Sequence, residues 1–195
     1  MPLGAHKAAI MGVAGVSTAD VVLLSTQTAD GDSEIEFTSD ITSTYGEYIF
    51  KIYNLNPADD EDGLTFNASI DGGSNYNVTK TSTAFTANHD EDGNPAAMGY
   101  ESSLDHAQQT SYQNLTGPMG NGADENGSLT IHLFNPSSTT YVKHFYSEST
   151  DNGFNRAMHC FRAGYLNTTS AVNAISFKTT AAGDFDGKFK MWGVK

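Results

Sequence analysis

Three acidic loops carry the side chains best suited to binding a metal ion. Each places carboxylates beside a glycine, in the segments 59–63, 90–94 and 184–187. Loops of this kind supply oxygen ligands to Ca²⁺. The candidate calcium ligands are Asp60, Asp62, Asp90 and Asp92. No loop completes the twelve-residue calcium pattern with a closing glutamate, and tight turns need Asp, Asn and Gly in any case. We therefore expect no cofactor, with calcium at these aspartates as the alternative.

The histidines and the cysteine do not form a zinc-binding or nucleophilic pattern. His132 and His144 fall on the two strands of one predicted hairpin, but a zinc site needs a third protein ligand. His159 precedes Cys160 directly, and neighbours on a strand point to opposite faces, so the imidazole cannot serve the thiol as a base. We expect Cys160 to be a small buried residue.

Paired carboxylates are the remaining catalytic candidates, because two of them can cleave a glycosidic bond. Glu34 with Glu36, or Glu101 with Asp105, would be such a pair. The reaction requires two carboxyl groups held about 5 to 10 Å apart across a cleft, which sequence spacing does not provide. We expect no enzymatic activity and no catalytic residue.

The segment 69–76, Ser-Ile-Asp-Gly-Gly-Ser-Asn-Tyr, resembles the Asp-box hairpin Ser-x-Asp-x-Gly-x-Thr-Trp of sialidase-like propellers. It occurs once, and Asn75 and Tyr76 replace the last two residues of the motif. In those families the motif is structural, since the aspartate accepts hydrogen bonds from turn amides. The resemblance implies a well-formed turn and no activity.

Composition excludes several partners. The chain has 195 residues, with 23 Asp and Glu against 10 Lys and Arg, and a net charge of −13. Nucleic acid is not expected as a partner, because phosphate binding requires clustered Lys and Arg. No apolar run of 18 residues is present to span a membrane as a helix. The single cysteine excludes an internal disulfide, so burial must stabilise the fold.

The segment 128–146 is the clearest structural signal. Leu129, Ile131 and Leu133 alternate with Thr130 and His132, which is the period-two pattern of a strand buried on one face. A polar loop that begins with Asn-Pro separates this run from a second one at 141–146. The two runs predict a β-hairpin.

Further short strands are predicted along the rest of the chain. The predicted strands lie at 21–28, 34–38, 47–55, 64–70, 76–79, 84–88, 97–102, 157–166, 172–179 and 188–194. The run 64–70 predicts Leu64, Phe66, Ala68 and Ile70 inward and Thr65, Asn67 and Ser69 outward. The segment 104–115 fits either a short helix or an extended chain. The pattern predicts an all-β fold, an antiparallel β-sandwich or jelly roll, with mainly local strand pairing.

Residues 1–18 form an apolar, glycine-containing N-terminal arm ahead of the sandwich domain 19–195. A secretory signal is not expected, because Gly12 and Gly15 weaken the apolar run. One interpretation is an extended arm that anchors the protein to a neighbouring subunit. The alternative is a strand or short helix packed on its own sandwich. The residues of the assembly arm would be Leu3, Ile10, Met11, Val13 and Val16.

Six segments together resemble small β-sandwich virion proteins of tailed bacteriophages, especially marine ones. They are the opening Met-Pro-Leu-Gly-Ala, the runs at 45–54, 69–76, 133–141 and 164–169, and the closing Gly-Lys-Phe-Lys-Met-Trp-Gly at 187–193. Each is weak alone, but their order and spacing cover nearly the whole chain. The family's closing strand usually ends in a Lys/Leu-Tyr-Gly-Ile type sequence, from which Trp192 and Val194 depart conservatively.

This resemblance implies a non-enzymatic viral structural protein on the virion exterior. The first hypothesis is a tail-associated fibre or receptor-binding module for host attachment, with a host surface glycan as a further partner. The alternative is a capsid decoration (cement) protein on the outside of the shell. A third hypothesis is a carbohydrate-binding, lectin-like module. The expected partners are the tail or the major capsid protein and further copies of the chain, with a trimer preferred over other oligomers.

Overall fold

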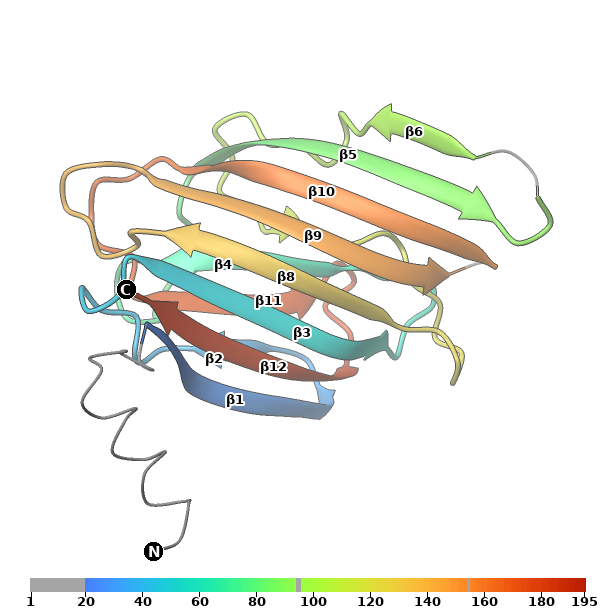
Figure 1. Cartoon of the computed structure of the whole chain (residues 1–195), viewed down its shortest axis with the longest axis horizontal. Helices are drawn as coiled ribbons and strands as arrows, with labels where there is room; N and C mark the ends of the chain where they lie inside the picture. The colour runs from blue at the N-terminus through green and yellow to red at the C-terminus, as the bar shows by residue number, and fades with distance from the viewer. Residues whose placement is uncertain (1–19, 94–95, 154) are drawn as a thin grey trace, which may run out of the picture.

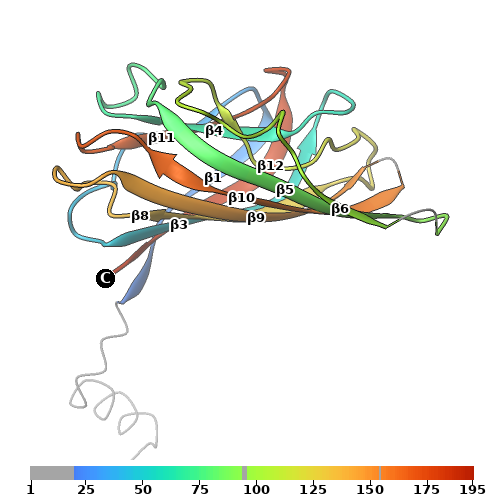
Figure 2. The same cartoon turned by 90° about the horizontal axis from the view of Figure 1, so that it is seen from above.

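The computed structural model describes residues 20–93, 96–153 and 155–195, and its strands form two antiparallel sheets packed face to face (Figure 1). The larger sheet has, in spatial order, β1 (Val21–Asp32), β12 (Phe185–Val194), β3 (Glu47–Pro57), β8 (Gly127–Phe134), β9 (Lys143–Gly153), β10 (Arg156–Leu166), β5 (Lys80–Asp90) and β6 (Ala97–Tyr100). The smaller sheet has β2 (Ile35–Phe37), β11 (Ala174–Thr179), β4 (Leu64–Ser69) and β7 (Gln113–Asn114). Seen from above, β4 and β11 lie over one face of the larger sheet (Figure 2).

The predicted all-β sandwich is confirmed, because the described residues contain strands and no helix. Within those residues, accordingly, no helix is long and apolar enough to cross a membrane. A jelly-roll arrangement stays a prediction. The predicted arm, with Leu3, Ile10, Met11, Val13 and Val16, lies outside the described residues.

The hairpin of β8 and β9 forms as predicted. The register pairs Leu129 with Ser149 and Leu133 with Phe145. Leu129, Ile131 and Leu133 are buried, while Thr130 and His132 lie on the other face. The alternation in the sequence therefore identified which side of this strand faces the core.

Other pairings in the larger sheet are non-local, contrary to the expectation of mainly local pairing. The last strand, β12, lies between β1 and β3, and β3 pairs with β8 on its other side. Strands from the two ends of the chain thus pair at one edge of the larger sheet, and β3 joins them to β8. A periodicity read along one strand does not reveal which distant strand will pair with it.

Aromatic side chains fill the space between the two sheets. Phe50 of the larger sheet lies 5.4 Å from Phe37 and 5.6 Å from Phe177, measured between ring centroids. Phe189 extends this contact from the neighbouring strand, with its ring 5.7 Å from Phe177. Tilted and edge-on ring pairs of this kind add to the free energy of burial. The apolar core therefore joins β3 and β12 to β2 and β11.

The prediction for the two faces of β4 is wrong on its outward side. Thr65, Asn67 and Ser69 are buried, because the segment 101–119 and the loop after β4 cover them. The Asn67 amide donates to the carbonyls of Tyr76 and Thr110, at 2.6 and 2.9 Å, which satisfies its buried polar group. Ile70, predicted inward, is 44% exposed because β4 ends at Ser69.

One other local prediction is wrong: the segment 76–79 is not a strand, and the chain crosses there from the smaller sheet to the larger one. The segment 104–115, for which helix and extended chain were both open, contains no helix; it is irregular and includes β7 near its end. At residues 30–32 the pairing of β1 is irregular, and the strand continues to Asp32.

The Asp-box-like segment forms the expected turn. Asp71 accepts hydrogen bonds from the Ser69 hydroxyl at 2.6 Å and from the backbone and side chain of Asn75 at 2.9 and 2.8 Å. The bond from the Asn75 amide, followed by that from Ser69, lowers the pKa of Asp71 to about 2. Gly72 and Gly73 have φ values of 74° and 91°, a conformation that favours glycine.

Candidate interaction surface on the larger sheet

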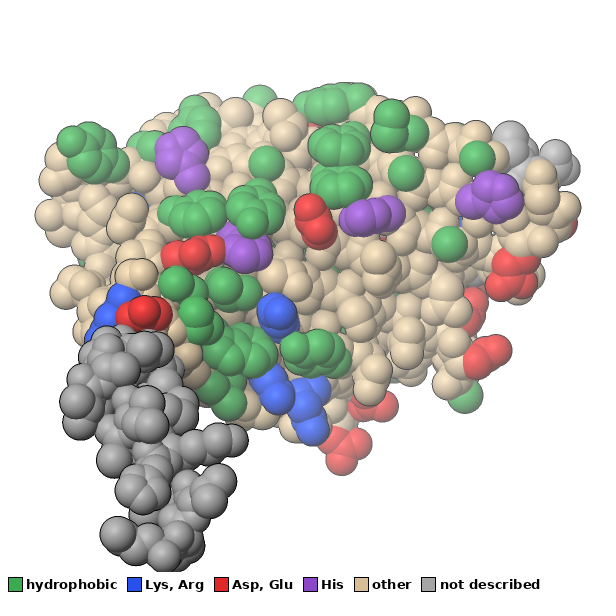
Figure 3. Space-filling model, viewed as in Figure 1, with side chains coloured by type: hydrophobic (Ala, Val, Ile, Leu, Met, Phe, Trp, Pro, Cys, Tyr) green, Lys and Arg blue, Asp and Glu red, His purple; other side chains and the backbone are tan. Residues whose placement is uncertain are grey.

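The outer face of the larger sheet carries aromatic rings, histidines and lysines on several strands in the described part of the chain. Along each strand, the residues between the buried ones point away from the smaller sheet. Figure 3 views this face and shows rings and histidines over several strands and a group of lysines on one side. We call it the outer face below.

Two ring clusters stand on the outer face. In the first, His132 stacks on Tyr146 with centroids 4.5 Å apart, and Phe134 lies 5.9 Å from Tyr146. In the second, Phe161 stacks on His159 at 4.2 Å and on Phe85 at 4.7 Å. Cross-strand ring pairs stabilise a sheet by themselves. Phe85 and Tyr146 remain 40% and 39% exposed, so both clusters also offer ring surface to a ligand.

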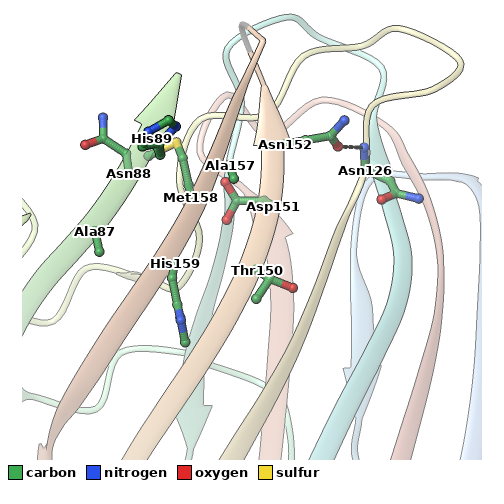
Figure 4. A pocket seen from close by; sticks show the side chains of 10 residues that line it. All are labelled: Ala87, Asn88, His89, Asn126, Thr150, Asp151, Asn152, Ala157, Met158 and His159. Carbon is green, nitrogen blue, oxygen red and sulfur yellow. Dashed lines mark hydrogen bonds between the residues drawn. The ribbon is translucent and has the colours of Figure 1, made fainter. Parts of the chain in front are cut away.

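Shallow hollows connect the two ring clusters. Two of them, with volumes of about 300 and 310 Å³, share Lys51, Thr130 and Glu148 in their walls. The hollow of about 300 Å³ shares Thr150 and His159 with a third, of about 550 Å³, at the ends of β5, β9 and β10. Figure 4 shows this third hollow, in which the Asn126 amide donates to Asn152 at 2.7 Å. The hollows are open and continuous, as in a surface that binds an extended partner.

Three lysines gather on the outer face. The register places Lys190 of β12 directly opposite Lys51 of β3, and Lys188 precedes Lys190 by two residues on the same side of β12. Among the described residues, none of the three has a carboxylate within 4.0 Å. Like charges directly opposite each other on neighbouring strands destabilise a sheet by about 0.2 to 1 kcal/mol. We call Lys51, Lys188 and Lys190 the lysine group.

The outer face holds one short histidine–carboxylate contact among the described residues. His132 Nδ1 lies 2.5 Å from Glu47 Oε1, and both side chains are partly exposed. The same imidazole stacks on Tyr146. Glu47 is therefore engaged with His132 and does not neutralise the lysine group.

The predicted metal ligands do not come together. Asp60 and Asp92 are exposed, and Asp90 pairs with Arg156 at 3.3 Å. Asp62 is buried and accepts from the backbone amides of Gly63 and Ala181, at 2.8 and 3.1 Å, so it anchors its loop to the chain after β11. Within residues 20–93, 96–153 and 155–195, no group of three potential ligands is arranged to hold a metal ion.

The histidine and cysteine candidates are also separated. His132 pairs with Tyr146 across the hairpin, while His144 contacts Tyr165 on the other side of β9. Cys160 is fully buried, and burial raises the pKa of its thiol. His159 lies on the outer face, so the two neighbours point in opposite directions, as the sequence predicted.

The carboxylate candidates have structural partners. Glu34 accepts hydrogen bonds from Ser176 and Tyr112, at 2.5 and 3.2 Å, on the smaller sheet. Asp105 accepts from the Tyr100 hydroxyl at 2.5 Å. Neither predicted pair, Glu34 with Glu36 or Glu101 with Asp105, lines a hollow of the outer face.

The interior beneath β5, β9 and β10 is polar. Lys80, Lys143 and Arg162 are almost completely buried there. Arg162 donates to the backbone carbonyls of Phe85 and Phe161, at 2.9 and 3.0 Å. Asp151 accepts from the Gly117 amide at 3.1 Å, and burial raises the pKa of its carboxyl. These groups connect the larger sheet to the loops that close the sandwich.

Sequence reasoning missed the outer face as a site. Its rings and lysines are spread from β12 to β5, and only the strand order brings them together. The alternation of Lys188 and Lys190 with Phe189 and Met191 was the one visible signal. No protein-family model matches this sequence, and no curated protein matches it either.

Proposed function

We propose that this protein is a non-enzymatic structural protein on the exterior of a tailed-phage virion, and that it acts as a tail-associated fibre or receptor-binding module. The observation that carries the attachment role is the outer face of the larger sheet. The smaller sheet does not cover this face, which combines two ring clusters, open hollows and three lysines that have no carboxylate within 4.0 Å in the described part of the chain. The placement in a virion rests on the family resemblance of the six sequence segments.

The arrangement of carboxylates supports a binding role over catalysis. Glu34, Asp62 and Asp105 are held by hydrogen bonds to neighbouring groups. Glycoside hydrolysis needs two carboxyl groups on opposite sides of a bound sugar. The hollows of the outer face are shallow and open, which suits recognition of a partner.

A capsid decoration protein is the second candidate. It is favoured by the exposed apolar edge of β1, the first described strand after the arm. Val21 and Leu23 are 55% and 49% exposed, and they pair with Val194 and Trp192 of β12. Such an edge is suited to contact with a shell subunit. A lectin-like module that is never part of a particle is the third candidate.

Copy number in the purified particle tests the proposal. Quantitative mass spectrometry is expected to find tens of copies or fewer for a tail position, whereas hundreds would establish decoration. Absence from the particle would refute both virion roles and leave the lectin-like candidate. Binding of the purified protein to host cells is expected for the receptor-binding module.

Deleting residues 1–18 tests the role of the arm. We expect a folded sandwich that no longer enters the particle, because the described residues form a buried apolar core between the two sheets. Loss of the fold would show that the arm belongs to the core. Light scattering on the full chain at micromolar concentration is expected to report a trimer, and a monomer would contradict the proposed oligomer.

A further inference from the structure

The lysine group has no carboxylate partner within 4.0 Å among the described residues. Of the ten Lys and Arg residues in the chain, three lie together here on a protein with a net charge of −13. Lys80, Lys143 and Arg162 are buried, and Arg156 pairs with Asp90. The facing pair Lys51 and Lys190 repels itself in the unbound protein. An anion bound between them would remove this repulsion, since the nearest strand partners offer no carboxylate within 4.0 Å.

Aromatic rings flank the lysine group on both sides. Trp192 follows Lys190 by two residues on β12, and Tyr53 follows Lys51 by two residues on β3, so both share the outer face. Because the two strands are antiparallel, Trp192 and Tyr53 lie on opposite sides of the Lys51–Lys190 row. The ammonium groups of Lys51 and Lys190 each lie 5.9 Å from the centroid of Trp192. Tyr53 is 38% exposed.

This combination of charge and rings defines the chemistry of the ligand. The lysines recognise acidic groups, and the flat rings provide apolar surface for the C–H faces of sugar rings. Short hydroxyl side chains, Ser128, Thr130 and Thr150, line the hollow next to Lys51. Hydroxyl groups both donate and accept hydrogen bonds, which suits the hydroxyls of a sugar.

We propose that the outer face binds an acidic polysaccharide, with the lysine group holding its carboxylate or sulfate groups and Trp192 and Tyr53 packing against its sugar rings. The chain of hollows, whose walls also include Glu148, then carries the neighbouring sugar units from Lys51 past Thr130 toward His159. This inference rests on the proposed attachment function and names the class of receptor. A nucleic acid is the competing polyanion, so a deoxythymidine hexamer is included in the test.

Trp192 makes the proposal directly measurable. It is the only tryptophan in the chain, so fluorescence excited beyond the absorption band of the tyrosines reports on this site. The probes are a β-1,4-linked mannuronate hexasaccharide for carboxylates, a sulfated galactan hexasaccharide for sulfates, and neutral β-1,4-mannohexaose as the matched control. We expect the emission of Trp192 to change with at least one acidic probe and not with the neutral one, and the affinity to fall as salt is added.

Variants of the full-length chain test the residues. Lys51→Gln together with Lys190→Gln is expected to weaken binding of the acidic probe by about tenfold or more. The melting temperature should be unchanged or slightly higher, because the facing charges are gone. The matched control is Lys178→Gln, which removes a positive charge from β11 of the smaller sheet and should leave the affinity unchanged.

Several outcomes would overturn the proposal. They are equal affinity for the neutral hexasaccharide, unchanged binding by the double variant, tighter binding of a deoxythymidine hexamer, or no response to either acidic probe. If the protein still binds host cells or is found in the particle while the acidic probes fail, only this inference is lost. If it does neither, the proposed attachment function fails as well.

Discussion

Lys80 offers the most quantitative test of how this sandwich is built. Its side chain is fully buried beneath β5, and its ammonium group donates to the Ser111 carbonyl at 2.6 Å. Burial lowers the pKa of Lys80 from 10.5 to about 8. The folded protein therefore binds this proton less tightly than the unfolded chain does.

The lowered pKa of Lys80 predicts a specific pH dependence of stability. Between about pH 8 and 10.5 the unfolded chain binds more protons than the folded one, so the free energy of unfolding rises with pH across this window. The shift of 10.5 to about 8 corresponds to about 3 kcal/mol, at 1.36 kcal/mol per pKa unit. This contribution is absent at neutral pH, where the buried ammonium remains charged.

The perturbation is Lys80→Met, which keeps an unbranched side chain of similar length and removes the charge. We expect the difference in stability between the wild type and the variant to change by about 2 to 3 kcal/mol from pH 7 to pH 10, in favour of the wild type. At pH 7 the variant gains stability because a buried charge is removed. It also loses about 1 to 3 kcal/mol of stability because the Ser111 carbonyl is left without its donor.

Urea denaturation of both proteins at a series of pH values measures this difference. Subtracting the free energy of unfolding of the variant from that of the wild type at each pH cancels the pH dependence that comes from other groups. These groups include Lys143, Cys160 and Tyr112, whose pKa values burial also shifts. Lys195→Met, at an exposed position, controls for loss of one positive charge. If the free energies of unfolding of the wild type and Lys80→Met differ by the same amount from pH 7 to pH 10, burial of the Lys80 ammonium does not lower its pKa as argued.

Three further predictions concern the turn, the core and the thiol. Asp71→Ala should lower the melting temperature at neutral pH. The difference in melting temperature between wild type and variant should shrink as pH falls from 3.8 toward about 2, because the lowered pKa of Asp71 adds stability only while its carboxyl is ionised. An equal difference at both ends of this pH range would contradict the prediction. Phe177→Ala should lower the free energy of unfolding, measured by urea denaturation, by about 3 to 5 kcal/mol, since the ring is fully buried against Phe50 and Phe189. Tyr141→Ala, at a 74% exposed site, should change the free energy of unfolding by less than about 0.5 kcal/mol. The Cys160 thiol should react with Ellman's reagent only after unfolding, because it is buried and its pKa is raised; rapid labelling of the native protein would show that β10 opens readily.

The turn chemistry of the acidic loops explains why they were candidate metal sites and why the structure gives them other roles. Asp62 and Asp71 both use their carboxylates to accept backbone amides. Asp90 meets Arg156 only because β5 and β10 are neighbours. Local sequence identifies groups that are able to bind a cation, while the fold decides which of them are already occupied.

Burial on the second face of a strand was the main structural feature that local pattern did not predict. Thr65, Asn67 and Ser69 alternate with apolar residues as outward groups do, yet all three are buried, and Asn67 donates to the Thr110 carbonyl of a distant loop. The same holds for Lys80, which a hydropathy pattern assigns to solvent. Polar residues can be buried wherever a distant loop supplies hydrogen bonds.

The sequence by itself determined the all-β class, the β8–β9 hairpin, the turn at Asp71 and the core-facing side of β8, because these depend on side-chain alternation and turn residues within a few positions of one another. Tertiary structure alone decided that β12 lies between β1 and β3, which sets Lys190 opposite Lys51 and Trp192 opposite Ile49. Strand order depends on contacts between residues far apart in the chain, and the outer face exists only through that order.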